Sequence, residues 1–185
     1  MTKTPFAELL LPGQEYLLKA QEQHGFEVVE HPKKESTGDK ARRLGWPRER
    51  IIKTVFFGYG KSQVGVVSPD FGKIDIARLL DTPKPMPPAR ELPAGMETGA
   101  CAPWMTAQHL EAGLELYISD AAVEGIVDIG LGSDERYSVQ MPYGLVHRIL
   151  EEEFKGRFGD RINKTLVPFI SKPYKTPVGG ELYGR

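Results

Sequence analysis

One strand-like run with a lysine at its centre restricts the fold more than any other stretch of this sequence. Residues 51–57 read Ile-Ile-Lys-Thr-Val-Phe-Phe and end at a glycine, which is typical of a buried β-strand. Side chains alternate between the two faces of a strand, so apolar residues occupy both faces and neither face is polar. Lys53 therefore lies among apolar side chains, where an unpaired ammonium costs several kcal/mol.

The spacing of Lys53 leaves two interpretations open. In the first, its ammonium meets a carboxylate, a phosphate or a water-filled cleft, as a functional lysine would. In the second, Lys53 lies on an edge strand, where it blocks aggregation or extends its ammonium to solvent. The choice between them depends on the rest of the chain.

Length and composition indicate one globular domain. The chain has 185 residues, of which 40% are hydrophobic and 26% are charged, and these values are ordinary for a folded domain. The single cysteine, Cys101, excludes an internal disulfide and fits a reducing compartment. No apolar run approaches the roughly 18 residues of a membrane span, and no signal-like segment follows Met1. We therefore expect a soluble, cytoplasmic protein that does not bind membranes.

Charge is unevenly divided along the chain. Residues 31–53 carry eight Lys or Arg against three Asp or Glu, and residues 155–185 carry seven against two. Residues 54–154 carry seven against fifteen. A basic block that contains Lys53 favours a phosphate-bearing partner, although a solvated helix face is the commoner meaning of such a run.

The order of the remaining elements predicts an α+β domain with six or so strands. Capping residues, apolar periodicity and glycine stops predict helices at residues 14–24, 36–44, 75–80 and 142–154. Alternating β-branched and aromatic residues predict strands at 26–31, 51–57, 62–68, 114–119, 126–129 and 137–141, with a hairpin connection at 58–61. The proline-rich residues 82–93 read as a stiff connector. Residues 1–157 then form the domain, and residues 158–185 form an irregular tail.

Three short motifs follow one another in a recognisable order. They are LGWPRERIIKTV at residues 44–55, Gly95 with GACAP at residues 99–103, and LYISD at residues 116–120. Their order and spacing over about residues 14–152 resemble the YbaK family of prolyl-tRNA-synthetase-associated editing domains. The resemblance implies a mixed, largely antiparallel sheet curled toward a barrel, with helices packed outside. It also implies hydrolysis in trans of the ester bond of a mischarged aminoacyl-tRNA, whose acceptor end is the expected partner.

The resemblance also assigns roles to individual residues. The family's strand lysine followed by Thr falls on Lys53 and Thr54, and its G-x-x-x-P loop falls on Gly99 and Pro103. The implied catalytic residues are Lys53, Gly99, Ala100 and Cys101. The implied substrate-binding residues are Pro103, Thr54 and Gly132. From the basic block, we expect tRNA to be bound by Lys40, Arg42, Arg43 and Arg48.

The chemistry of this reaction needs little from side chains. An aminoacyl ester is already activated, so a deacylase must position a water and stabilise the oxyanion. Backbone N–H groups from Gly99 to Cys101 suit that task, since small residues let the main chain approach the ester. By the resemblance, the terminal 2′-hydroxyl of the tRNA helps to orient the water, while Lys53 holds the terminal phosphate or the carbonyl region. Without the resemblance, the loop reads as a plain tight turn.

Departures from the family pattern keep a second function open. Ala100 stands where the family often has glycine, and Ala102 stands where serine usually precedes the proline. The alternative is a non-catalytic module of the same fold that binds aminoacyl-tRNA, an amino acid or a nucleotide.

Other polar residues offer weaker sites. Cys101 has no recognised histidine partner, so we expect it to be a packed loop residue, not a nucleophile. Asp120 and Asp128 read as caps or surface groups. The four histidines lack metal-ligand spacing, and we expect no metal and no cofactor.

Overall fold

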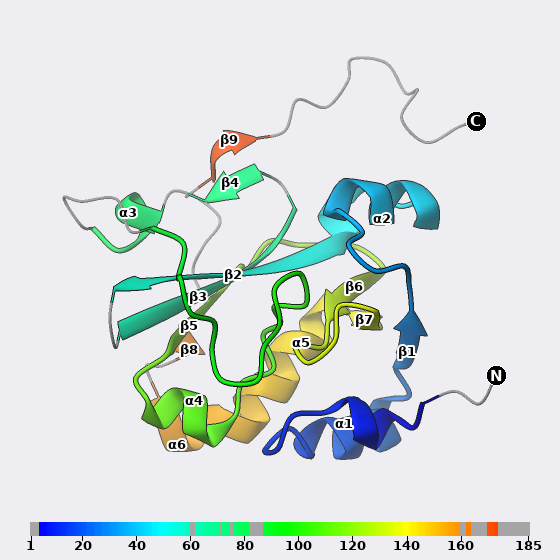
Figure 1. The fold of residues 1–185 in the computed structure, drawn as a ribbon, viewed down its shortest axis with the longest axis horizontal. Helices are drawn as coiled ribbons and strands as arrows, with labels where there is room; N and C mark the ends of the chain where they lie inside the picture. Colours follow the sequence, from blue (N-terminus) through cyan, green and yellow to red (C-terminus); the bar gives the residue numbers. More distant parts are fainter. Residues whose placement is uncertain are drawn as a thin grey trace.

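The computed structural model describes residues 4–59, 62–70, 72–74, 76–81, 87–159, 162–163 and 170–173. Within these residues the fold is built on a seven-stranded mixed sheet in the order β1-β7-β6-β2-β3-β5-β8 (Figure 1). Three neighbouring pairs are antiparallel and three are parallel, so the expected largely antiparallel sheet is instead an even mixture. The sheet is open, with β1 and β8 at its two ends, and does not close into a barrel.

The elements follow one another in an α+β order. The strands are β1 (Glu27–Glu30), β2 (Ile51–Tyr59), β3 (Ser62–Pro69), β4 (Gly72–Ile74), β5 (Glu115–Ile118), β6 (Ile126–Gly130), β7 (Tyr137–Pro142), β8 (Ile162–Asn163) and β9 (Ile170–Pro173). The helices are α1 (Tyr16–His24), α2 (Thr37–Leu44), α3 (Ile76–Leu79), α4 (Ala107–Glu111), α5 (Tyr143–Leu150) and α6 (Gly156–Phe158). Shorter turns are η1 (Phe6–Leu9), η2 (Arg48–Arg50) and the π-helical η3 (Glu151–Lys155), which continues α5.

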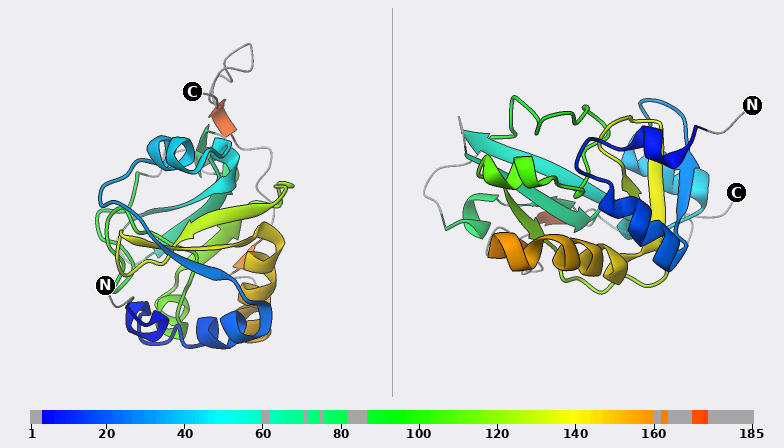
Figure 2. Two further views of the ribbon diagram at one scale, coloured as in Figure 1. Left: turned by 90° about the vertical axis from the view of Figure 1, so that its right-hand side faces the viewer. Right: turned by 90° about the horizontal axis from the view of Figure 1, so that it is seen from below.

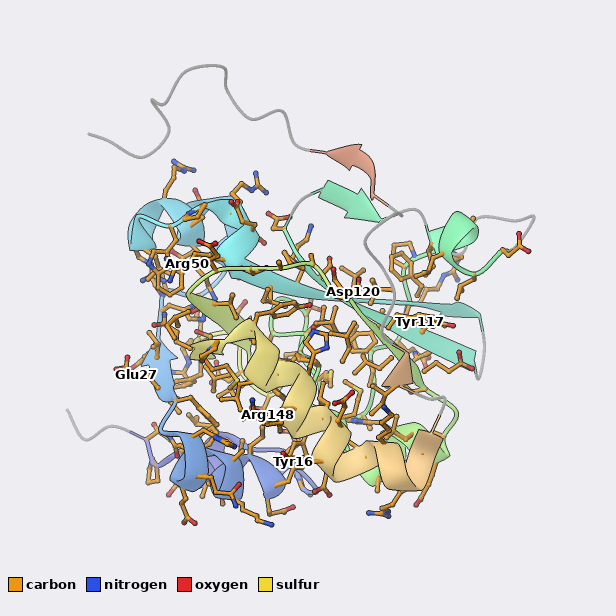
Figure 3. All side chains as sticks on the ribbon, turned by 180° about the vertical axis from the view of Figure 1, so that it is seen from behind. Tyr16, Glu27, Arg50, Tyr117, Asp120 and Arg148 are labelled. Carbon is orange, nitrogen blue, oxygen red and sulfur yellow. The ribbon has the colours of Figure 1, made fainter. Side chains whose placement is uncertain are left out.

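Helices lie on both sides of the main sheet (Figures 1 and 2). Helix α2 lies on one side, and α1, α4 and α5 lie on the other. Helix α5 buries Leu145, Val146, Ile149 and Leu150 in the main core, as its apolar periodicity predicts. Tyr16, which Figure 3 labels on α1, lies close to the segment that continues α5. Its ring packs edge-on against that of Phe154 in η3, with ring centroids 5.3 Å apart. The main core therefore lies between the sheet and α1 with α5, which leaves the α2 side for polar side chains.

Local capping signals predicted the helix ends correctly. Ser36 accepts a hydrogen bond from the backbone N–H of Asp39 at the start of α2. Gly25 and Gly45 end α1 and α2 in the left-handed conformation, with φ of 69° and 66°. The predicted helices and strands are all present, with ends that differ by a few residues.

Five helices and strands were not predicted: α4, α6, β4, β8 and β9. Thr106 is the N-cap of helix α4: its hydroxyl accepts from the N–H of His109, while the His109 ring accepts from the N–H of Thr106. Strand β8 joins β5 in the main sheet, and β4 pairs with β9 in a separate two-stranded sheet. Two short strands thus lie in the segment after residue 157, which was expected to be irregular.

Some predictions fall partly outside the described residues. Gly60 and Lys61 of the predicted hairpin, the proposed helix cap Asp75, and residues 82–86 of the connector are among them. Among the described residues, no helix combines the length and the apolar character needed to cross a membrane.

Strand β2 is an inner strand of the main sheet. It pairs with β3 along its whole length and with β6 at Ile51 and Ile52. The interpretation of Lys53 as an edge-strand residue is therefore wrong, because β2 has a neighbour on each side. Lys53 shares the face of Ile51, whereas Thr54 shares the core-facing side of Ile52.

Candidate functional site

A pocket of about 210 Å³ opens where β2 separates from β6. The parallel pairing of these strands covers only Ile51 with Asp128 and Ile52 with Ile129, and the next three residues of β2 line the pocket. The loop of residues 99–101 and the segment around α2 form the other walls. The polar lining side chains are His31, Glu35, Thr37, Lys40, Lys53, Thr54, Cys101, Asp128, Glu135 and Tyr137.

Lys53 meets a buried carboxylate. Its ammonium forms an ion pair with Asp70, whose side chain is fully buried just after β3. Arg48 donates two hydrogen bonds to the other oxygen of Asp70, from Nε at 2.9 Å and Nη2 at 2.6 Å. Asp70 thus fixes two cations beside the start of β2, and 23% of the Lys53 side chain stays accessible. This arrangement offsets the cost of a lysine in a buried strand and leaves it reachable from the pocket.

A second buried ion pair lies on the α2 side of the pocket. Lys40 Nζ donates to Asp128 Oδ1 at 2.8 Å and lies 3.1 Å from His31 Nε2. The other oxygen of Asp128 accepts hydrogen bonds from Ser138 at 2.8 Å and Gln140 at 3.1 Å. Asp128 is 1% exposed and is therefore neither a cap nor a surface group, which corrects the prediction for this residue. Its burial is tolerated because both oxygens are satisfied.

The neighbours of Lys40 have shifted pKa values. Burial, and then the charge of Lys40, lower the pKa of His31, so its ring is neutral at pH 7 and its Nε2 accepts from the ammonium. Arg43 donates two hydrogen bonds to Glu35, at 2.7 Å and 2.9 Å, and these bonds lower the pKa of the carboxyl. The α2 side is therefore a network of paired charges.

The loop of residues 99–101 is shaped by a tight turn. The Ala100 N–H donates to the Glu97 carbonyl at 3.1 Å, and Gly99 adopts φ of +88°, a conformation that favours glycine. The Ala100 N–H is thus already engaged. The N–H groups of Gly99 and Cys101 have no acceptor among the residues that the structure describes. They remain the two candidate oxyanion donors of the loop.

Cys101 is poorly suited to act as a nucleophile. Burial raises the pKa of its thiol, which keeps the sulfur protonated at neutral pH. Its Sγ makes a weak contact of 3.8 Å with the Glu97 carbonyl.

Gly130 lets the loop approach the sheet. A Cβ on Gly130 would lie 2.8 Å from the Ala100 carbonyl oxygen and 3.2 Å from that of Cys101. Trp104, which is fully buried, donates from its ring N–H to the Gly130 carbonyl at 2.9 Å. The end of β6 and the loop are therefore in direct contact through backbone atoms, and a side chain at Gly130 would separate them.

Thr54 lines the pocket and carries a buried hydroxyl without a partner. The residue is 7% exposed, and its Oγ1 has no hydrogen-bond partner among the described residues. A buried hydroxyl without a partner costs about 1–3 kcal/mol, so Thr54 is a local destabilising feature beside the pocket.

The pocket brings together most of the residues that the motifs single out. Lys53, Thr54, Gly99, Ala100 and Cys101 all line it, although they come from distant parts of the sequence. Lys40 also lines it, but as a buried ion-pair partner and not as a surface cation. Pro103 and Gly132 are buried behind the loop, where the Gly132 carbonyl accepts from the N–H of Glu97 at 2.9 Å. The pocket lining does not include Arg42, Arg43 and Arg48.

Several residues that line the pocket were not predicted from the sequence. They are His31, Glu35, Thr37, Asp128, Gly130, Glu135 and Tyr137. Within the described residues, no group of three His, Cys, Asp or Glu side chains is arranged to hold a metal ion.

Comparison with known proteins supports the fold. No family model and no curated protein sequence matches this chain. Among solved structures, a protein proposed to be a trans-editing enzyme for prolyl-tRNA synthetase is similar, with a TM-score of 0.57 and 18% identity over 85% of this chain and 98% of that one. A protein described as hypothetical has a TM-score of 0.57 and 16% identity over 82% of this chain and 99% of that one. At these identities the similarity shows a shared fold, which is compatible with the YbaK-like fold.

Proposed function

We propose that this protein is an aminoacyl-tRNA deacylase that edits in trans. The observation that carries the proposal is that Lys53 and the loop of residues 99–101 line one and the same pocket. The fold likeness to a protein proposed to be a trans-editing enzyme supports it. The pocket is of a size for an amino-acid side chain and the ester beside it, and the substrate is the acceptor end of a mischarged tRNA.

The proposed reaction is hydrolysis of the ester by water. The Gly99 and Cys101 N–H groups stabilise the oxyanion, and a preorganised donor of this kind is worth about 3–4 kcal/mol. Lys53, held by Asp70, attracts the terminal phosphate or the carbonyl oxygen. The terminal 2′-hydroxyl of the tRNA helps to orient the water, as the family resemblance implies. The main chain and one lysine thus supply the chemistry that an activated ester needs.

A panel of mischarged tRNAs tests this function. Purified protein is incubated with alanyl-, cysteinyl- and seryl-tRNA, including tRNAs specific for proline, and release of the amino acid is followed. We expect hydrolysis of at least one mischarged tRNA and none of correctly charged prolyl-tRNA. Absence of hydrolysis across the panel would contradict the proposal.

The engaged Ala100 N–H favours one alternative, a non-catalytic module that binds aminoacyl-tRNA, an amino acid or a nucleotide. The loop then offers the N–H groups of Gly99 and Cys101 as donors, and not that of Ala100. Two donors are enough to bind a carbonyl group in the pocket. Binding without hydrolysis in the same panel would identify this module.

Cys101→Ala should change the deacylation rate by no more than about twofold, since the thiol is protonated and the proposed donor is the backbone N–H. The rate is measured with the preferred mischarged tRNA, and the melting temperature is followed as the control for folding. A variant that binds tRNA normally but has lost all activity would show that the sulfur is the nucleophile.

Surface cations on the α2 side should carry affinity for tRNA. Arg43 and Arg48 are engaged with Glu35 and Asp70, so their reversal would disturb the pocket itself. The exposed cations Lys33, Lys34 and Arg42 are better probes, because none of them lines the pocket and Arg42 pairs with the exposed Asp39. Reversing all three to Glu should weaken tRNA binding about tenfold or more at low salt, and wild-type affinity should fall as salt rises.

A matched control reverses three exposed cations on the other side of the sheet. The changes Lys19→Glu, Lys155→Glu and Arg157→Glu alter the net charge equally, on α1 and around α6. Affinity is measured by filter binding over a salt series. Equal losses in both triple variants, or a wild-type affinity that ignores salt, would refute the assignment of the binding face.

A further inference from the structure

Glu135 differs from the other acidic residues of the pocket. Each of the others has an ionic partner in the structure: Asp128 pairs with Lys40, and Glu35 pairs with Arg43. Glu135 makes no ion pair and no hydrogen bond with any residue that the structure describes. Its carboxylate is therefore available to a cation that enters the pocket.

The position of this carboxylate is defined by the loop. Glu135 Oε2 lies 3.2 Å from the place that a Cβ on Gly99 would occupy. The negative charge is thus beside the backbone that the proposed function assigns to the ester carbonyl. The carboxylate is thus a direct neighbour of Gly99. A group attached close to the carbon of an ester held by the loop can therefore reach the carboxylate of Glu135.

We propose that Glu135 binds the α-ammonium group of the aminoacyl ester and so selects esters with a free amine. The proposal rests on the proposed function. In an aminoacyl ester the ammonium nitrogen is two bonds from the carbonyl carbon, so an ester held at Gly99 places the ammonium next to Glu135. An N-acylated or peptidyl ester lacks this charge and adds bulk where the carboxylate lies. Glu135 therefore determines substrate specificity, whereas the backbone N–H groups of the loop remain the oxyanion donors.

A matched pair of substrates tests the proposal without any change to the protein. The panel substrate that is hydrolysed fastest is compared with the same tRNA carrying the N-acetylated amino acid. Wild-type protein should cleave the acetylated form about tenfold more slowly or worse, as expected for the loss of a charge-assisted hydrogen bond.

The variant Glu135→Gln keeps the size of the side chain and removes its charge. It should lose about tenfold in kcat/KM on the free-amine substrate and nothing on the acetylated one. Glu111→Gln, at an exposed glutamate on α4, is the control and should behave as wild type. Equal losses on both substrates, or an undiminished preference for the free amine, would overturn the assignment.

A binding measurement separates this inference from the proposed function. The probes are 3′-alanylamino-3′-deoxyadenosine, whose amide is not an ester, and its N-acetyl derivative. If wild-type protein hydrolyses nothing but prefers the free-amine probe, and Glu135→Gln loses that preference, the role of Glu135 stands and the deacylase proposal fails. If hydrolysis occurs without any preference for the free amine, the deacylase stands and the role of Glu135 fails. No preference in either assay refutes both.

Discussion

Lys53→Ala is expected to lower kcat/KM for deacylation by about 100-fold or more while the protein stays folded. The ammonium is one of two cations on Asp70, and Lys53, unlike Arg48, lines the pocket with the loop of residues 99–101. The variant removes that charge from the site but leaves Asp70 with its two hydrogen bonds from Arg48. A loss of activity with a nearly unchanged melting temperature would separate a functional lysine from one that only neutralises a buried carboxylate.

The control for this experiment is a lysine of the same charge outside the pocket. Lys155 pairs loosely with Glu151, at 3.8 Å, and most of its side chain is exposed. Lys155→Ala should keep wild-type activity. If Lys53→Ala retains activity within about threefold, or if it unfolds the protein, the ammonium is structural and the proposed chemistry is wrong.

Local signals explain why much of the fold was predictable. Helix ends depend on one or two neighbouring residues, as at Ser36, Gly25 and Gly45, so the sequence carries that information directly. Strand β2 was also recognised from its composition alone. The sheet order was not, because the parallel pairing of β2 with β6 joins residues more than 70 positions apart and leaves no local pattern.

The site was predictable only where a short motif marks it. Lys53, Thr54 and the loop of residues 99–103 were identified in this way, and the structure shows that Lys53, Thr54 and residues 99–101 line one pocket. Lys40 was expected to bind tRNA as part of the basic block, a role that needs an accessible ammonium. Its burial follows from Asp128, which lies 88 residues away and gives no sign of this contact in the sequence.

Two glycines, one ending β6 and one just after it, could likewise not be told apart from the sequence. Both Gly130 and Gly132 lie in a turn-like sequence, and Gly132 was the one assigned to the substrate. Gly132 has φ of +99°, and a Cβ there would lie 3.6 Å from Ala102 and from Met96. Gly130 is the residue in contact with the loop of residues 99–101. Only the approach of a loop from 30 positions earlier distinguishes them.

Gly130→Ala should therefore reduce kcat/KM by about 100-fold, because a shift of about 1 Å in a catalytic group has effects of that size. The added methyl would lie 2.8 Å from the Ala100 carbonyl oxygen, and backbone atoms cannot rotate away as a flexible side chain can. The loop must move, and with it the N–H groups of Gly99 and Cys101. Gly130 is a cleaner site for this test than Gly99, whose φ of +88° strains any side chain regardless of contacts.

Gly144→Ala is the matched control for this substitution. Gly144 lies on the exposed side of α5, and a Cβ there has no atom within 4 Å. This variant should keep full activity and gain a few tenths of a kcal/mol or more in stability, since alanine favours a helix by about 1 kcal/mol over glycine. Deacylation rates and melting temperatures are measured for both variants. Full activity in Gly130→Ala, with the variant folded, would mean that the position of the loop backbone does not matter to the reaction, and the water-based mechanism with backbone oxyanion donors would have to be abandoned.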